Sequence, residues 1–165
     1  MQPTFEEFVA VRGRALLSFA LMLCGDRHRA EDLVQSVLVK AYPRWSRIVR
    51  MERPEAYLKT VLVNEHLRWW RRRSSREVPV PQHPGTLPGE DPAGAHASRD
   101  AAWRLLGALP PKQRAVLVLR YYEDLSDAQI GAVLGCGEST VRSQATRALA
   151  TLRAALPAMD KEARP

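Results

Sequence analysis

The chain has 165 residues, of which 45% are hydrophobic and 26% are charged, a composition that is ordinary for a folded globular protein and too apolar for a disordered one. No apolar run approaches the roughly 18 residues of a membrane-spanning helix, and the N-terminus lacks the basic-then-apolar pattern of a secretory signal. The two cysteines, Cys24 and Cys136, lie far apart, which disfavours a disulfide framework and a zinc site. We therefore expect a cytoplasmic protein with no membrane insertion, no metal and no cofactor.

Charge and proline content divide the chain, whose formal net charge is +7. Residues 1–76 hold 15 basic and 8 acidic residues, and residues 98–156 hold 8 basic and 5 acidic residues. Between them, residues 77–97 contain no basic residue, three acidic residues, five prolines and three glycines. Such a segment does not sustain a helix or a central strand. The pattern predicts two small domains joined by a flexible acidic linker over 77–97, with a tail over 157–165.

The first domain is predicted to be all-α. Thr4 and Glu7 fit a capping box that begins a helix, and Gly25 ends it. Asp26 can cap a second helix, which Pro43 stops. Apolar residues recur at helical spacing along both helices. They are Phe8, Val11, Ala15, Phe19 and Met22 in the first helix, and Ala30, Leu33, Val34, Val37, Leu38 and Ala41 in the second.

Residues 45–53 are predicted to form a loop, after which Pro54 opens a third helix with Leu58, Val61 and Leu62 facing inward. This helix ends in a region that contains five arginines between positions 68 and 76, interleaved with two tryptophans. Arginine pairs bidentately with phosphate, and aromatic faces stack on unpaired bases. The helix end is therefore either a surface for single-stranded nucleic acid or a solvated basic end beside two core tryptophans.

Glu31, Asp32 and Gln35 lie close together on the second predicted helix. Paired carboxylates can perform acid–base chemistry, but no histidine, nucleophile or metal-ligand pattern accompanies them here. A solvated helix face and an acidic contact for another protein remain the two alternatives.

The second domain is also predicted to be helical. Ser98 or Asp100 can cap a helix around Trp103, Pro111 begins the next, and Ser126 with Gln129 forms a second capping box. A glycine turn over 135–137 then separates a short helix from a longer one over 138–156. This order is typical of a DNA-binding helix-turn-helix, and the alternative is an ordinary helical hairpin.

The last predicted helix has two distinct faces. An apolar face should pack inward, while a polar and basic face lies near the N-terminal half, the part of a recognition helix that enters the major groove. The inward residues are Val141, Ala145, Ala148, Leu149 and Leu152, and the outward residues are Thr140, Arg142, Ser143, Thr146 and Arg147.

In this order and spacing, these motifs resemble one family, the extracytoplasmic-function (group IV) sigma factors of bacterial RNA polymerase. Ala30–Gln35, followed by Lys40 and Ala41, resembles the core-binding helix of sigma region 2. The segment that melts and reads the minus-ten element is resembled by Trp45, Pro54–Leu58, Asn64 and Arg71–Arg73. Region 4, which reads the minus-thirty-five element, is resembled by Leu109-Pro110 with Arg114, by Leu119–Ser126, and by Thr140–Ser143 with Arg147-Ala148. The Trp69-Trp70 pair is most similar to an actinobacterial subgroup.

The resemblance implies a fold of two small helical domains, region 2 over 1–76 and region 4 over 98–156. It implies that RNA polymerase core, mainly its beta-prime clamp coiled coil and its beta flap, and promoter DNA are partners, with an anti-sigma factor as a further candidate. The residues implied to contact core polymerase are Glu31, Asp32 and Gln35. Those implied to contact the minus-ten element are Arg47, Arg50, Asn64, Arg68, Trp69, Arg71, Arg72 and Arg73. Those implied to contact the minus-thirty-five element are Thr140, Arg142, Ser143, Thr146 and Arg147.

Four positions depart from the family pattern. Arg68 stands where many members carry an acidic residue, Gln129 and Gly131 stand where a glutamate and an alanine are usual, and Gly137 stands where the turn usually offers a serine or threonine cap. These differences concern promoter preference.

Two other functions are weighed against a sigma factor. A free-standing operator-binding regulator would need a dimerisation domain, which has no use for outward Glu31, Asp32 and Gln35 beside an arginine–tryptophan block. A nucleic-acid enzyme would need a phosphate-binding loop, metal ligands or a nucleophile, and the sequence has none of these motifs. We therefore expect a promoter-specificity subunit that is not an enzyme.

Overall fold

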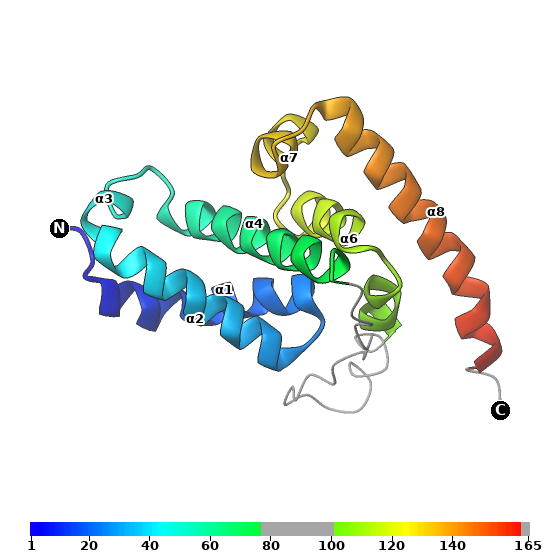
Figure 1. Cartoon of the computed structure of the whole chain (residues 1–165), viewed down its shortest axis with the longest axis horizontal. Helices are drawn as coiled ribbons and strands as arrows, with labels where there is room; N and C mark the ends of the chain where they lie inside the picture. The colour runs from blue at the N-terminus through cyan, green and yellow to red at the C-terminus, as the bar shows by residue number, and fades with distance from the viewer. Residues whose placement is uncertain (77–100, 163–165) are drawn as a thin grey trace. The chain divides into compact units, whose positions relative to one another are not determined.

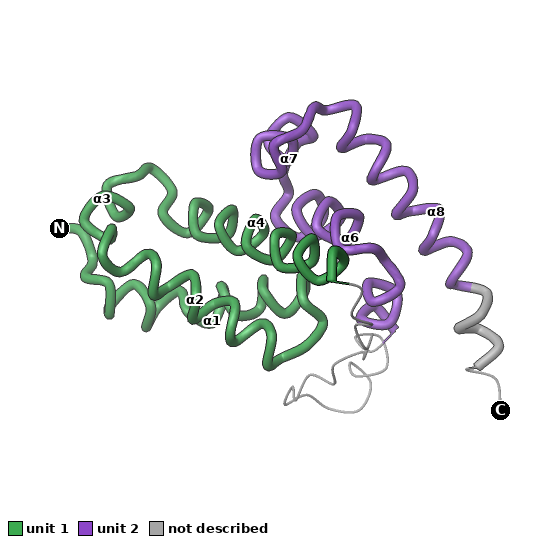
Figure 2. Tube along the Cα trace, viewed as in Figure 1, with its two compact units in different colours: residues 1–78 green, residues 79–165 purple. Residues whose placement is uncertain are grey.

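A computed structural model describes residues 1–76 and 101–162, and the side chains up to residue 156. In these ranges the chain is helical and contains no strand, so the predicted all-α fold is confirmed (Figure 1). The chain divides into two compact units, residues 1–78 and 79–165 (Figure 2). The predicted linker and the caps proposed at Ser98 and Asp100 lie outside the described residues.

The first unit contains three long helices and two short ones. The long helices α1, α2 and α4 pack pairwise against one another. The bounds are α1 Phe5–Cys24, α2 Arg27–Ala41, the 3-10 turn η1 Tyr42–Arg44, α3 Trp45–Ile48 and α4 Pro54–Ser74.

The predicted helix ends in the first unit are confirmed. The Thr4 hydroxyl accepts a hydrogen bond from the Glu7 amide at 3.2 Å, and the Glu7 carboxylate accepts one from the Thr4 amide at 2.8 Å. Gly25 ends α1 with φ of 67°, a backbone conformation that glycine adopts without steric cost. Asp26 caps α2 by accepting from the Arg29 amide. These local hydrogen bonds satisfy donors that a helix terminus leaves unpaired.

The core of the first unit contains large apolar side chains from all three long helices. Leu16 and Phe19 of α1, Val37 of α2, and Leu58 and Leu62 of α4 are each almost completely buried. The expected stripe of α1 is only partly right. Val11 is 73% exposed, because Leu16, Ala20 and Leu23 define the side of α1 that packs inward.

The predicted loop over 45–53 begins with a helical turn instead. In α3, Trp45 and Ile48 lie three residues apart and both are buried, so burial favours a turn of helix. The Trp45 indole donates to the Pro3 carbonyl at 3.1 Å and packs against the ring of Phe8, with centroids 4.8 Å apart. This anchor fixes the start of the connection that leads to α4.

The second unit contains a helical segment over 101–107 followed by the predicted helix-turn-helix. The Ser126–Gln129 capping box is present at the start of α7. Leu109, Leu117 and Ala148 form a buried cluster, against which Leu149 and Leu152 pack. The bounds are α6 Pro111–Leu117, the π-helical turn η2 Val118–Tyr122, α7 Asp127–Leu134 and α8 Glu138–Glu162.

The last helix is longer than expected, because α8 continues past Leu156 to Glu162. The residues predicted as a tail therefore begin as helix. Pro157 has no amide hydrogen to donate to the Arg153 carbonyl, so the sequence favours an end of the helix near this residue. The loss of one backbone hydrogen bond does not always end a helix, and α8 continues through Pro157.

The turn between α7 and α8 folds closely over α7 at Gly131. A Cβ atom built on Gly131 would lie 2.6 Å from the Cys136 carbonyl oxygen, and the Cys136 amide donates to the Gly131 carbonyl at 3.0 Å. Gly135 provides the reversal with φ of 70°. Glycine at position 131 therefore allows the backbone to approach this closely.

We expect Gly131→Ala to lower the free energy of unfolding of the second unit by about 1–3 kcal/mol, because the added methyl must displace backbone. Gly107→Ala is the matched control, since nothing lies within 4 Å of its Cβ position. Urea-dependent hydrogen exchange at the Ile130 and Val141 amides measures the effect. Equal stability of the two variants would contradict the close approach.

Candidate nucleic-acid and protein interfaces

The outer face of α2 presents two of the three predicted protein-contact residues. Asp32 and Gln35 are exposed and lie three residues apart, so they share a helix face. Glu31 differs because its carboxylate accepts from the Arg27 guanidinium at 2.8 Å and is therefore partly neutralised within α2. The uncompensated acidic group on this face is Asp32.

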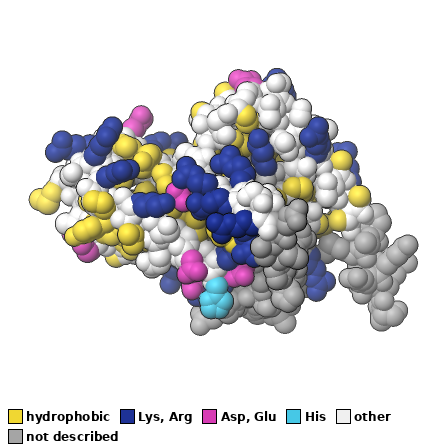
Figure 3. Space-filling view, viewed as in Figure 1, with side chains coloured by type: hydrophobic (Ala, Val, Ile, Leu, Met, Phe, Trp, Pro, Cys, Tyr) yellow, Lys and Arg dark blue, Asp and Glu magenta, His cyan; other side chains and the backbone are white. Residues whose placement is uncertain are grey.

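The C-terminal end of α4 is strongly basic. Lys and Arg side chains gather on the visible face over α4 in Figure 3. Arg71 and Arg72 are exposed, as are Arg47 of α3 and Arg50 in the turn that follows α3, whereas Asn64 in the middle of α4 is half-buried. The predicted minus-ten residues thus lie at both ends of α4 and along it.

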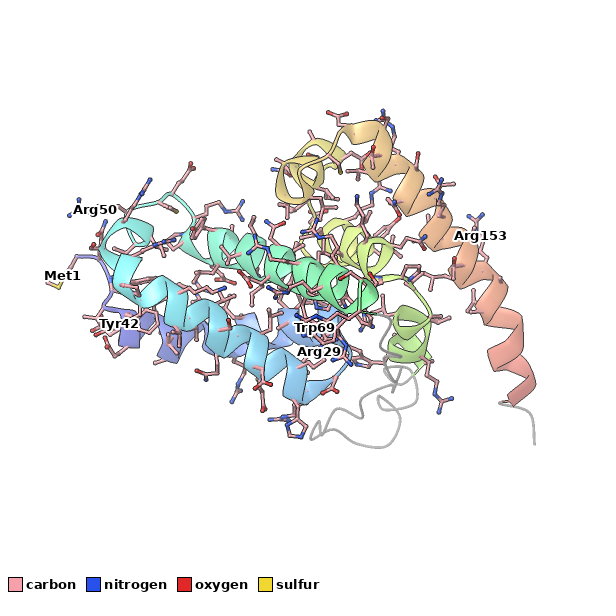
Figure 4. All side chains as sticks on the ribbon, in the orientation of Figure 1. Met1, Arg29, Tyr42, Arg50, Trp69 and Arg153 are labelled. Atoms are coloured by element: carbon pink, nitrogen blue, oxygen red, sulfur yellow. The ribbon has the colours of Figure 1, made fainter. Side chains whose placement is uncertain are left out.

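Trp69 has a neighbour that the sequence analysis missed. The Arg29 guanidinium of α2 lies 3.4 Å from the centre of the Trp69 ring, and the two side chains lie next to each other in Figure 4. Arg73 lies 4.8 Å from the same ring, and Trp70 meets Trp69 edge-on with centroids 5.1 Å apart. Because Arg29 occupies a ring face, a base cannot stack on that face. Trp69 therefore serves at least in part as a support for cations.

His66 lies beneath this stack and is only 1% exposed. One Arg29 nitrogen lies 3.3 Å from its Nδ1, and the Cys24 sulfur lies 3.6 Å from the same atom. Since guanidinium nitrogens only donate, Nδ1 accepts. Burial lowers the pKa of the Arg29 guanidinium and the nearby charge of Arg73 lowers it further, whereas Cys24 and Asp26 raise it.

Glu65 is the acidic group within the basic half of α4. Its carboxylate accepts from Lys40 of α2 at 2.8 Å and from Arg68 at 3.3 Å. The hydrogen bond from Lys40 is the main cause that lowers the pKa of Glu65. Arg68 is thus held by an acidic residue one turn earlier.

In the second unit, α8 has the two faces that the sequence predicts. Val141, Ala145 and Ala148 are buried. On the other side Arg142, Ser143, Thr146 and Arg147 are exposed and Thr140 is half-buried. Arg142 lies 3.5 Å from the Glu138 carboxylate, a solvent-exposed pair that restrains the side chain only weakly.

The outward hydroxyl groups of α8 already donate within the helix. Ser143 donates to the Ser139 carbonyl at 3.0 Å, and Thr146 donates to the Arg142 carbonyl at 2.9 Å. Their oxygens remain exposed, so both side chains are oriented before any ligand arrives.

Within residues 1–76 and 101–162, no helix is long and apolar enough to cross a membrane. In the same part of the chain, no three histidine, cysteine or acidic side chains are grouped so that they could hold a metal ion.

Comparison with known proteins places both units in characterised families. Residues 8–76 match Sigma-70 region 2, and residues 99–152 match Sigma-70, region 4. The RNA polymerase sigma-E factor of Streptomyces coelicolor is 42% identical over 160 residues, which cover 97% of this chain and 90% of that protein. The ECF RNA polymerase sigma factor SigL of Mycobacterium tuberculosis is 36% identical over 94% of this chain and 88% of its own length. A solved structure of the sigma factor RpoE in complex with the anti-sigma factor NepR, from Bartonella quintana, matches with a TM-score of 0.71 and 25% identity, over 93% of this chain and 96% of that chain.

The Lys40–Glu65 contact predicts a pH-dependent contribution to stability. Because the folded state lowers the pKa of Glu65, this contribution is present above the ordinary carboxyl pKa of 4.5 and is lost as the pH falls through the lowered value. Lys40→Met should lower the free energy of unfolding of the first unit by about 0.5–1 kcal/mol at pH 7. The difference in the free energy of unfolding between Lys40→Met and the wild type should disappear as the pH falls below 4.5.

Urea unfolding of the first unit at several pH values measures this difference. Arg14→Met is the control, since Arg14 is an exposed cation on α1. A difference between Lys40→Met and wild type that is the same at every pH would exclude Glu65 as its source.

Proposed function

Because the chain belongs to the extracytoplasmic-function group of sigma-70 family sigma factors, which direct promoter-specific transcription initiation by RNA polymerase, we propose that it reads its promoter in two physical states. The second unit reads the minus-thirty-five element as duplex, and the first unit reads the minus-ten element as a melted strand. The observation that carries this proposal is the presence of a differently shaped basic surface on each unit. One is an exposed helix face, and the other combines a helix end with a preceding turn.

The exposed face of α8 is suited to duplex DNA. An α-helix with its side chains is about 10–12 Å across, which matches the roughly 12 Å width of the major groove. Arg142 and Arg147 can pair with guanine edges or with phosphates, and Ser143 and Thr146 lie between them in the sequence. The second helix of a helix-turn-helix makes such contacts from its N-terminal half.

The first unit is suited to an unpaired strand, because its basic side chains lie both before α4 and at the C-terminal end of α4, so that a single strand could follow the length of this helix. The turn that carries Arg50 precedes α4, and the arginine block ends it. Since α4 has 21 residues, these points lie roughly 30 Å apart at about 1.5 Å per residue. At the spacing of about 3.4 Å per nucleotide in one strand of duplex DNA, that length corresponds to at most roughly nine nucleotides, and to fewer in an extended unpaired strand. A base removed from the stack can enter the 46–53 segment, with Asn64 and the block from Arg68 to Arg73 along the strand.

The same unit would bind core polymerase through exposed residues of α2. Asp32 and Gln35 on α2 provide an exposed acidic and polar pair for the basic side of the beta-prime clamp coiled coil, and the second unit would meet the beta flap. Domain boundaries at 1–76 and 98–156, with 77–97 as linker, belong to this proposal. So does a cytoplasmic setting, where the chain would act as a dissociable subunit with no catalytic site of its own. An anti-sigma factor is a further partner of this proposal, which the relative solved with NepR supports.

We expect Asp32→Arg to weaken binding to core polymerase by about 2–4 kcal/mol, because the reversed charge would face basic residues across the interface. Fluorescence anisotropy of the labelled chain, titrated with core polymerase, measures the affinity. Glu6→Arg is the matched control, since Glu6 is an exposed carboxylate on α1 outside the proposed face. An unchanged affinity of a folded Asp32→Arg chain would reject this contact.

Arg142→Ala and Asn64→Ala should fail on different templates. Arg142→Ala should weaken binding to a duplex upstream element by about 1–3 kcal/mol if Arg142 pairs with guanine, and should have little effect on a pre-melted template with only the downstream element. Asn64→Ala should show the reverse pattern. Run-off transcription with polymerase and each variant on both templates separates the cases. Equal loss by both variants on both templates would contradict the proposed division of labour.

A further inference from the structure

The observation that indicates a further binding site is the group of side chains around Trp69. Arg29 of α2 and Arg73 of α4 lie 3.4 Å and 4.8 Å from the centre of one indole ring. Arg29 also lies 5.3 Å from the centre of the Trp70 ring. Two guanidinium groups from different helices are therefore gathered on the same aromatic support, although like charges repel.

Among the described residues, neither arginine forms an ion pair with a carboxylate. Arg29 directs one nitrogen to His66 Nδ1, and Arg73 has a buried Nε with no acceptor in the same part of the chain. By contrast, Lys40 and Arg68 are both paired with the Glu65 carboxylate. The Trp69 group thus brings together two cations that, within residues 1–76 and 101–162, have no carboxylate partner.

An anion is the ligand that such an arrangement fits. A guanidinium has five N–H donors, and two of them match the oxygens of a phosphate. Stacking on Trp69 restricts the rotation of both side chains, so less freedom is lost on binding. Because Arg29 covers one face of the Trp69 ring, stacking of a base on that face is disfavoured relative to binding of a phosphate to the guanidinium groups.

Building on the proposed function, we infer that Arg29 and Arg73, supported by Trp69, form a site for one phosphodiester group of the melted promoter strand. Arg29 lies outside the segment that matches the minus-ten motif, and its contact to the strand would come from α2. This site would hold the backbone and read no base, so its contribution is independent of promoter sequence. Exposed Arg71 and Arg72 would guide the neighbouring phosphates.

The test uses holoenzyme assembled from core polymerase and the full chain, bound to a forked template with a single-stranded minus-ten segment. Affinity is measured between about 50 and 200 mM KCl. Arg29→Gln should weaken binding about three- to tenfold for every strand sequence, and should reduce the slope of log affinity against log salt by about 0.7. Arg29→Lys should keep most of the slope, because the charge remains. Arg14→Gln, an exposed cation on α1, is the control and should leave the slope unchanged.

A second measurement identifies the phosphate. In each template one phosphate is replaced by a neutral methylphosphonate. At one position this replacement should weaken binding of the wild-type holoenzyme. At the same position it should not weaken binding further when the chain carries Arg29→Gln or Arg73→Gln. If Arg29→Gln lowers affinity with an unchanged salt slope and no such position exists, Arg29 is only a brace between α2 and α4, and the inference is wrong.

Inorganic phosphate, titrated at constant ionic strength and followed by tryptophan fluorescence, distinguishes a free anion from a strand phosphate. The inference would also be overturned if the wild type binds inorganic phosphate saturably, Arg29→Gln does not, and Arg29→Gln nevertheless keeps the wild-type slope of log DNA affinity against log salt. Throughout, the wild-type chain must bind core polymerase and support run-off transcription. Failure of the wild type there would count against the proposed function itself, whereas failure of the Arg29 variants to differ counts only against this site.

Discussion

The apolar packing of α4 against α1 and α2 is the constraint on which the arrangement of the first unit depends. Leu58 and Leu62 of α4 are buried in the same core as Phe19 and Val37. Burying such side chains contributes about 1.5–3 kcal/mol each, which is enough to hold the helices in one register. With the inner faces occupied, Asp32 on α2 and the arginines at the end of α4 are left on the surface of one rigid body. A partner bound at α2 would therefore fix the position of the basic end of α4.

The acidic residues of α4 form ion pairs with cations of α4 itself and of the neighbouring helices α1 and α2. Glu55 near the start pairs with Lys59 at 3.0 Å and with Arg12 of α1 at 3.4 Å. Glu65 pairs with Lys40 and Arg68. These pairs neutralise cations over the first two thirds of the helix, whereas the last turns contain arginines without acidic residues between them. The positive potential thus concentrates at one end, where a phosphate backbone would be attracted most strongly.

Much of the fold could be predicted from the sequence, because the signals that define it are local. The capping boxes at Thr4 and Ser126 and the glycine at position 25 act within four residues, and each is present as expected. The stack of Arg29 on Trp69 could not be predicted, because its members lie far apart in the chain and meet only through the packing of α2 on α4. The need for glycine at position 131 likewise depends on a carbonyl oxygen that approaches from the next turn.

The hydroxyl groups of Ser143 and Thr146 have a chemical consequence for any base edge that reaches them. Each hydrogen is engaged by a carbonyl of the preceding turn, so each oxygen faces outward with lone pairs only. An amino group, such as N4 of cytosine or N6 of adenine, would find an acceptor there. A purine N7 or a thymine O4 would meet a second acceptor until the hydroxyl rotated and gave up its bond to the helix. The backbone of α8 thereby biases which bases these two side chains can favour.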